Sequence, residues 1–260
     1  MAPADDPGPQ TVTRSPLIHP LRSVAAAFLS LLYPERCQLC RIAHATPADG
    51  LVCINCRDSI QFIRPPACER CGLPFSGDIR HRFECSNCRG IDLAFSRARS
   101  AIRAEGAARE LIHHYKYHRA FWLEPLFTQL WLPVALPDLA PHSWTGIVPV
   151  PLHPVRQRER EFNQAERLAR LLAQPLQLPV RSDLVHRLHA TATQTRLTRE
   201  ERAENVRRAF TPSPATRLPH TRWIVVDDVL TTGATTDAVA RVLKRMGADE
   251  VVVWTLARGV

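Results

Sequence analysis

Eight cysteines in four Cys-x-x-Cys pairs restrict the folding of this chain more than any other feature. They all lie between residues 37 and 88, a region without long periodic segments, and twelve residues separate the first two pairs and thirteen the last two. A Cys-x-x-Cys turn directs two thiolates at one point, and two such turns supply the four sulfurs of a tetrahedral zinc site. The pattern therefore predicts a small module held together by zinc. The expected ligands are Cys37, Cys40, Cys53, Cys56, Cys68, Cys71, Cys85 and Cys88.

Two ligand pairings satisfy this pattern. Sequential pairing assigns the first four cysteines to one ion and the last four to another, and a cross-braced pairing is also open because eleven residues separate Cys56 from Cys68. Both pairings fill two sites completely, so the zinc is expected to be structural and not catalytic. A disulfide framework would need an oxidising compartment, and the chain shows no export signal. Iron–sulfur ligation is disfavoured by the cysteine spacing.

Sequence patterns divide the chain into four parts. Residues 1–20 contain many prolines and few large apolar side chains, so we expect a disordered tail. Residues 21–34 have apolar positions at helical spacing and predict a helix that Pro34 ends. Residues 35–93 form the predicted double zinc ribbon. The longest apolar run, nine residues from Val24 to Leu32, is shorter than the about 20 residues of a membrane-spanning helix, and we expect a cytoplasmic protein.

Residues 94–260 alternate between segments that resemble strands and segments that resemble helices. The expected strands are 146–150, 223–226 and 250–256, and the expected helices include 106–117, 162–172 and 238–246. A strand, a helix and a strand over about 35 residues are typical of a βαβ unit. The fold class is therefore α/β, with a parallel sheet that carries helices on both faces.

The most informative segment for function is IVVDDVLTTGATT, residues 224–236. A buried strand ends in Asp227 and Asp228, and a polar loop then leads into a helix. Backbone N–H groups and the dipole at a helix N-terminus favour a phosphate, while carboxylates suit sugar hydroxyls or a magnesium shell. The loop residues are Thr231, Thr232, Gly233, Ala234 and Thr235. The segment lacks both the GxxxxGK[ST] pattern of nucleoside triphosphate loops and the GxGxxG dinucleotide turn.

The sequence VVDDVLTTGAT resembles the signature of type I phosphoribosyltransferases, which bind phosphoribosyl pyrophosphate (PRPP). The resemblance implies that Asp227 and Asp228 contact the ribose hydroxyls, that the loop after them wraps the 5-phosphate, and that Mg²⁺ accompanies PRPP. Purine-salvage members carry an acidic residue at the position of Thr231. The threonine here disfavours purine salvage.

Further motifs resemble the ComF family of zinc-ribbon, phosphoribosyltransferase-like proteins, which are linked to DNA uptake during natural transformation (competence). They are the cysteine pairs, LIHHYKYH at 111–118, VPVPLHP at 148–154, FNQAE at 162–166, TQTRLTREER at 193–202 and NVRRAF at 205–210. Glu161 stands where glycine is expected before FNQ. The resemblance implies a pyrophosphate-side loop at Val150 and Pro151, and a role with DNA-uptake proteins; single-stranded DNA is a further possible partner.

Positive charge adds candidates for the pyrophosphate side of this site. The formal net charge is +9, and all but two of the basic residues are arginines. Arg156 and Arg160 follow the predicted pyrophosphate loop, and guanidinium groups match phosphate oxygens in bidentate geometry. Lys116 is a further candidate, and the polar residues 194–205 are candidates for a lid over the ligand. A generally solvated basic surface also accounts for some of this charge.

Three functions remain open at this point. The first is pentosyl transfer from PRPP to a nitrogen nucleophile, for which no catalytic base can be assigned. The second is a PRPP or nucleotide sensor without turnover. The third is a single-stranded DNA adaptor in which the zinc ribbons and arginines bind the strand.

Overall fold

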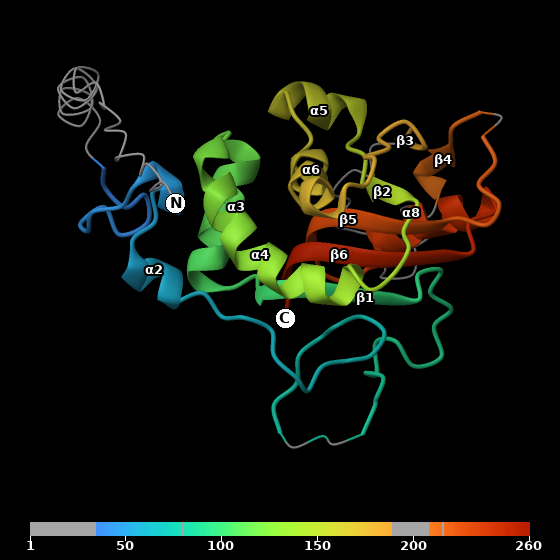
Figure 1. The fold of residues 1–260 in the computed structure, drawn as a ribbon, viewed down its shortest axis with the longest axis horizontal. Coiled ribbons are helices and arrows are strands. Elements are labelled where there is room, and N and C mark those ends of the chain that lie inside the picture. Colours follow the sequence, from blue (N-terminus) through green and yellow to red (C-terminus); the bar gives the residue numbers. More distant parts are fainter. Residues whose placement is uncertain (1–34, 78, 80, 189–207, 215) are drawn as a thin grey trace, which may run out of the picture. The chain divides into compact units, whose positions relative to one another are not determined.

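The computed structural model describes residues 35–77, 79, 81–188, 208–214 and 216–260. Contacts divide the chain into residues 1–35 and 36–260, and only the second unit is described below. The predicted tail, the predicted helix at 21–34 and the candidate lid at 194–205 lie outside the described residues. The elements in chain order are η1 (Pro47–Asp49), α2 (Ile54–Asp58), β1 (Arg97–Arg103), α3 (Gly106–Tyr117), η2 (Phe121–Leu123), α4 (Glu124–Leu139), β2 (Gly146–Pro149), α5 (Pro154–Arg160), α6 (Gln164–Leu176), β3 (Val185–Arg187), β4 (Phe210–Pro212), β5 (Arg222–Leu230), α8 (Ala234–Arg245) and β6 (Glu250–Arg258) (Figure 1).

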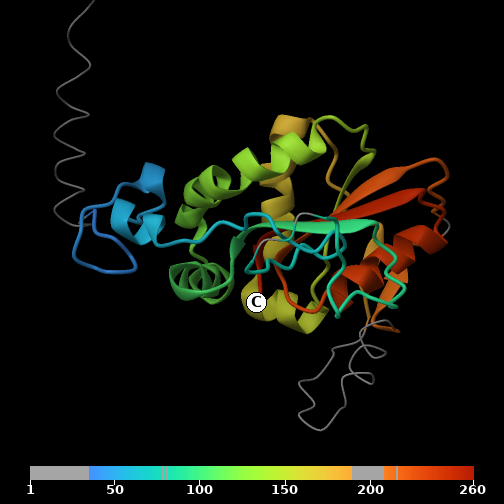
Figure 2. The same ribbon diagram turned by 90° about the horizontal axis from the view of Figure 1, so that it is seen from below.

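Four parallel strands form the central sheet in the order β1-β6-β5-β2. β5 and β6 lie in the middle and consist largely of buried apolar residues, as expected for strands covered on both faces. α4 and α6 cover one face and α8 covers the other (Figure 2). The α/β fold with a parallel sheet between helices is therefore as predicted. Because the strands are parallel, their carboxyl ends share one edge, where ligands of such sheets bind.

β5 is longer than the sequence predicts. It continues past Val226 to Leu230, because β6 lies alongside and pairs Asp227 with Thr255 and Leu230 with Arg258. The expectation that the strand ends in the two aspartates is therefore wrong, since it continues for two residues beyond Asp228. Both carboxylates project from the last part of the strand and not from the loop after it.

α4 has no clear signal in the sequence, since Pro133 and Pro137 lie inside it. Proline removes a helical hydrogen bond and usually ends a helix. Here burial outweighs that penalty: Leu126, Leu130 and Trp131 are at most 1% exposed and belong to the core between α4 and the sheet.

The cysteine-rich segment packs on the α/β domain at two places. In the first ribbon, Gly50 is so close to α4 that a Cβ atom there would lie 2.9 Å from Cβ of Leu126. In the second ribbon, the carbonyl of Arg70 accepts a 2.7 Å hydrogen bond from N–H of Ala98 in β1. Within the described ranges, no helix is long and apolar enough to cross a membrane.

Candidate functional site

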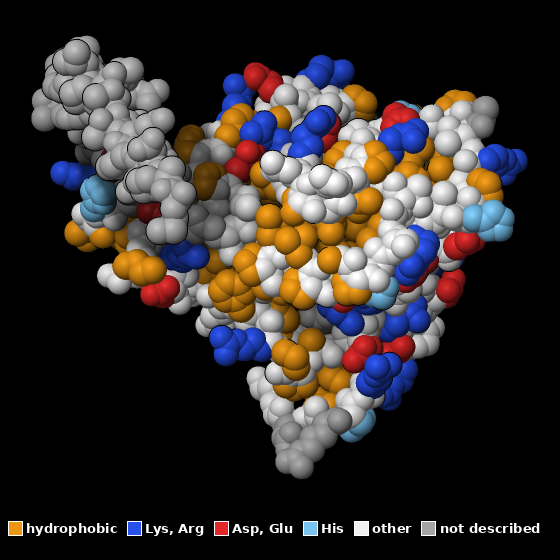
Figure 3. Space-filling model, viewed as in Figure 1, with side chains coloured by type: hydrophobic (Ala, Val, Ile, Leu, Met, Phe, Trp, Pro, Cys, Tyr) orange, Lys and Arg blue, Asp and Glu red, His pale blue; other side chains and the backbone are white. Residues whose placement is uncertain are grey.

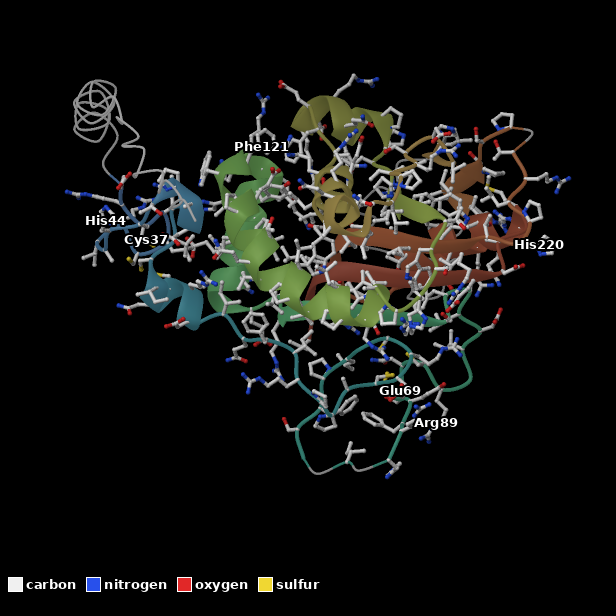
Figure 4. All side chains as sticks on the ribbon, in the orientation of Figure 1. Cys37, His44, Glu69, Arg89, Phe121 and His220 are labelled. Atoms are coloured by element: carbon white, nitrogen blue, oxygen red, sulfur yellow. The ribbon has the colours of Figure 1, made fainter. Side chains whose placement is uncertain are left out.

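The cysteines form two separate clusters with sequential pairing. The first contains Cys37, Cys40, Cys53 and Cys56, and the second contains Cys68, Cys71, Cys85 and Cys88. Figure 4 labels Cys37 in the first ribbon, and Glu69 and Arg89 in the second, which lies apart from it. All eight cysteines are free, so the disulfide alternative does not hold.

The spacing of the sulfur atoms fits zinc. Sγ of Cys40 lies 3.8 Å from Sγ of Cys53, and Sγ of Cys71 lies 3.7 Å from Sγ of Cys85. Four sulfurs at about 2.3 Å from a tetrahedral ion are about 3.8 Å apart. When bound, zinc would connect the two Cys-x-x-Cys turns of each ribbon, which have little regular secondary structure. Each cluster supplies four sulfurs, so both sites are structural.

Backbone N–H groups prepare individual thiols to lose their proton. Burial of Cys37 opposes its charge, but hydrogen bonds from the backbone at Cys53 and Cys40 outweigh burial and lower its pKa to about 6. In the second cluster, burial of Cys68 is outweighed in the same way, and its pKa falls to about 7; N–H of Cys85 donates to its Sγ at 3.3 Å. Zinc ligands bind as thiolates, so these donors favour metal binding.

The two aspartates of β5 differ in their surroundings. Side chains alternate between the two faces of a strand, so Asp228 faces α3 together with Val226, and Asp227 faces the opposite side. Asp228 is 4% exposed, and its Oδ2 forms an ion pair with Nζ of Lys116, from the last turn of α3. Burial raises the pKa of Asp227 to about 6, although Lys116, Arg187 and Arg160 all act to lower it.

The loop after β5 leads directly into the N-terminus of α8. Gly233 has φ +82° and precedes α8, which begins at Ala234, so the position favours glycine for its conformation. Oγ1 of Thr232 accepts a hydrogen bond from N–H of Ala234 at 3.4 Å, and Thr231 and Thr232 are exposed. The first turn of α8, with Thr235, leaves N–H groups without intrahelical partners and directs its dipole at the loop.

The predicted pyrophosphate side lies at the same edge of the sheet. N–H of Val150 donates to the carbonyl of Val226 at 2.9 Å, so the chain after β2 runs beside β5. The carbonyl of Val150 accepts from Asn163 at 3.0 Å, and half-buried Pro151 leads on to α5. This contact holds the Val150–Pro151 turn close to the acidic pair.

The end of α3 and the helix α5 line a basic pocket. It has a volume of about 370 Å³ and is lined by Lys116, Tyr117, Arg119, Arg156, Glu159 and Arg160. Arg160 contacts the Tyr117 ring with its Cζ 4.8 Å from the ring centroid, and it donates to Gln164 at 3.0 Å. Lys and Arg side chains gather over α5 on the face shown in Figure 3. Lys116, which the sequence analysis predicts as a phosphate ligand, thus lines the pocket and forms an ion pair with Asp228.

Arg187 is a site residue that the sequence analysis does not single out. It ends the three-residue strand β3, its Cζ lies 5.2 Å from the Phe210 ring centroid, and its charge acts on Asp227. Burial lowers the pKa of Arg187, and the like charge of Arg156 adds to this effect. A three-residue strand has no periodicity, so the sequence carries no usable signal for this arginine.

Glu161, where the family resemblance implies glycine, has φ +65° and caps α5 in the left-handed conformation. That is the backbone region which favours glycine. Its carboxylate forms a 2.5 Å ion pair with the exposed Arg119. The backbone at position 161 therefore has the conformation that favours glycine. Glutamate adopts this conformation with backbone strain.

Comparisons with known proteins agree with this architecture. The profile of the double zinc ribbon domain matches residues 28–89. Competence protein F of Haemophilus influenzae is 31% identical over 228 residues, which cover 86% of this chain and 96% of that protein. The DNA utilization protein YhgH of Escherichia coli strain K12 is 32% identical over 234 residues, 88% of this chain and 99% of that protein. Competence protein ComFC of Streptococcus pneumoniae is 24% identical over 215 residues, 81% and 89% of the two chains. With a double zinc ribbon followed by the parallel sheet, and with this similarity over most of its length, the chain belongs to the ComF family.

Proposed function

We propose that this protein binds PRPP, with Mg²⁺, at the carboxyl edge of β5 and β2, and that it acts in the handling of DNA during uptake. The observation that carries the proposal is the acidic pair followed by a glycine-capped helix N-terminus at this edge. A phosphate suits the helix start, and the sugar hydroxyls suit the carboxylates.

The charge around the site supports a ligand with both phosphate and hydroxyl groups. Lys116, Arg160 and Arg187 act electrostatically on Asp227, and Arg156 acts on Arg187. These positive charges exceed the single negative charge of Asp227. The excess positive charge suits the negatively charged pyrophosphate group. The partly exposed Asp227 fits a magnesium shell, which takes oxygen ligands from one or two carboxylates and from substrate phosphates.

The reaction that fits this ligand is pentosyl transfer. The bond from C1 of the ribose to pyrophosphate breaks, a nitrogen nucleophile forms the new bond to C1, and its proton passes to solvent. Asp227 would help to hold Mg²⁺, which would offset charge on the leaving pyrophosphate, and the basic side chains would orient that group. Binding of PRPP without turnover is the alternative within the same site.

The names of the relatives support the cellular part of the proposal. Two of the relatives carry competence in their names and one is called a DNA utilization protein. We therefore propose single-stranded DNA or proteins of DNA uptake as partners, and the cytoplasm as the location, where zinc thiolates remain reduced.

The experiment that tests the site is calorimetric titration with Mg-PRPP. Changing Asp227 and Asp228 together to asparagine should weaken binding by about tenfold or more, since charged hydrogen bonds are worth about 1.5–3 kcal/mol each. Asp249→Asn is the matched control, because Asp249 is exposed and lies just before the amino end of β6. Unchanged affinity in the double variant would contradict the proposal. Release of pyrophosphate in the presence of nucleobases or amines would separate an enzyme from a binding protein.

A further inference from the structure

Arg258 links the second cysteine cluster to the loop after β5. It is the last residue of β6, lies opposite Leu230 in the sheet and is 4% exposed. Its Nη1 donates to the carbonyls of Leu230 at 2.9 Å and Thr231 at 2.5 Å. Its Nη2 donates to Sγ of Cys71 at 3.8 Å. One side chain therefore joins a zinc ligand to the two residues that open the loop.

The chemistry of these contacts makes Arg258 difficult to replace. A guanidinium keeps its charge when buried, so it needs strong acceptors around it. A metal-bound thiolate is such an acceptor, and hydrogen bonds to ligands fix their orientation in metal sites. The planar fork of arginine reaches the sulfur with one nitrogen and the carbonyls with the other. Lysine has a single nitrogen and cannot span both ends.

A second set of contacts lies beside this link. Oδ1 of Asp237, in the first turn of α8, accepts from N–H of Ala94 at 2.7 Å. Arg241 donates to Asp237 at 2.8 Å and to Asp92 at 3.2 Å. The chain leaving the second ribbon is thus fastened to α8, but these bonds do not reach the loop carbonyls.

We propose that Arg258 is a positioning residue, which holds the backbone of Leu230 and Thr231 in place by anchoring it to the thiolate of Cys71. The order of the loop then depends on the second zinc cluster and not on the first. Binding of the 5-phosphate by this loop rests on the function proposed above. The role of Arg258 in holding the loop backbone does not depend on that function.

Hydrogen–deuterium exchange of the loop amides in the full-length, zinc-loaded protein tests the link without any ligand. In Arg258→Lys, the amides of residues 230–233 and of Gly259, whose N–H donates to the carbonyl of Leu230 at 2.8 Å, should exchange about tenfold faster, because the loop carbonyls lose their charged donor and this backbone opens more often. Arg241→Lys is the matched control, since it weakens the neighbouring attachment only, and it should leave these amides unchanged. Cys71→Ser should speed their exchange as Arg258→Lys does, whereas Cys40→Ser, in the first cluster, should not.

Equal loop exchange in wild type and Arg258→Lys, both with two zinc ions, would overturn the inference. Unchanged loop exchange in Cys71→Ser would overturn it even if Arg258→Lys failed to fold. A titration with Mg-PRPP keeps the two proposals apart. If the wild type binds no PRPP, the proposed function fails while the exchange data still decide the role of Arg258. If PRPP binds and Arg258→Lys weakens it about tenfold without loss of zinc, both stand.

Discussion

At the residue scale, Asp227 combines a charge with an environment that opposes it. Burial raises its pKa to about 6, above the about 3.9 of a free aspartate, despite three nearby cations. Folding therefore favours the protonated form. The stabilising contribution is complete below about pH 4 and is lost as the pH rises through 6. A carboxylate with a raised pKa among several cations is typical of functional sites, where binding and not stability selects the residue.

Asp227→Asn should therefore stabilise the protein while it weakens PRPP binding. At pH 7.5 the gain in unfolding free energy is up to about 3 kcal/mol, and it should fall to about half by pH 5. Urea unfolding at the two pH values measures it, with Asp249→Asn as the control that changes little. An Asp227→Asn protein less stable than wild type at pH 7.5 would show that the carboxylate stabilises the fold.

Glu161 has a backbone conformation that disfavours its side chain, and two variants test this. Glu161→Gly and Glu161→Ala both remove the ion pair with Arg119. Only glycine adopts φ +65° freely, so the glycine variant should be more stable than the alanine variant by about 1 kcal/mol, or about 2–4 °C in melting temperature. Equal melting temperatures would mean that the turn relaxes around alanine.

At the scale of elements, the sequence predicts those whose pattern is continuous. α3 lies at the predicted residues, and β6 begins at the predicted Glu250, because α3 has helical apolar spacing and β6 is a continuous apolar run. Apolar patterns predict neither the end of β5 nor any part of α4. Tertiary pairing with β6 extends β5, and burial keeps α4 helical despite its prolines.

The contact of the second ribbon with β1 gives a prediction for this scale. Gly72 has φ +65°, and a Cβ atom there would lie 2.8 Å from the carbonyl oxygen of Ala98; Gly90 has φ +75° with no atom within 4 Å. Alanine at either position has similar backbone strain, but only Gly72→Ala also clashes with β1. Gly72→Ala should therefore be less stable than Gly90→Ala by about 2 kcal/mol in denaturant unfolding. Equal stabilities would argue against a close ribbon–strand contact.

At the scale of the whole molecule, the two clusters differ in exposure. Cys40 and Cys56 of the first cluster are partly exposed, whereas all four cysteines of the second are buried, and Arg258 donates to Cys71. The candidate site draws on several separate segments, and the sequence predicts residues in each of them except the segment that carries Arg187. The loop after β5 was found through its motif. The place of Arg187 near Asp227 and the ion pair of Lys116 with Asp228 depend on contacts between distant segments, so the sequence does not predict them.

A chromogenic chelator should therefore remove zinc in two phases, one ion per phase. The first cluster should lose its ion about tenfold faster, given the hydrogen bond that supports the second. Cys40→Ser should abolish the fast phase and retain the slow one. A single phase, or loss of the slow phase in Cys40→Ser, would contradict the assignment.

Because β1 pairs with β6, the last strand of the chain, the sheet can be completed only late in synthesis. Oγ of Ser100 and Oγ1 of Thr255 share a hydrogen bond at 2.6 Å although they are 155 residues apart. Both cysteine clusters leave the ribosome well before β6 is synthesised, so their metal can bind while β1 still lacks its neighbour. Translation that stopped before β6 would release a product with both cysteine clusters but without the strand that pairs with β1 and β5.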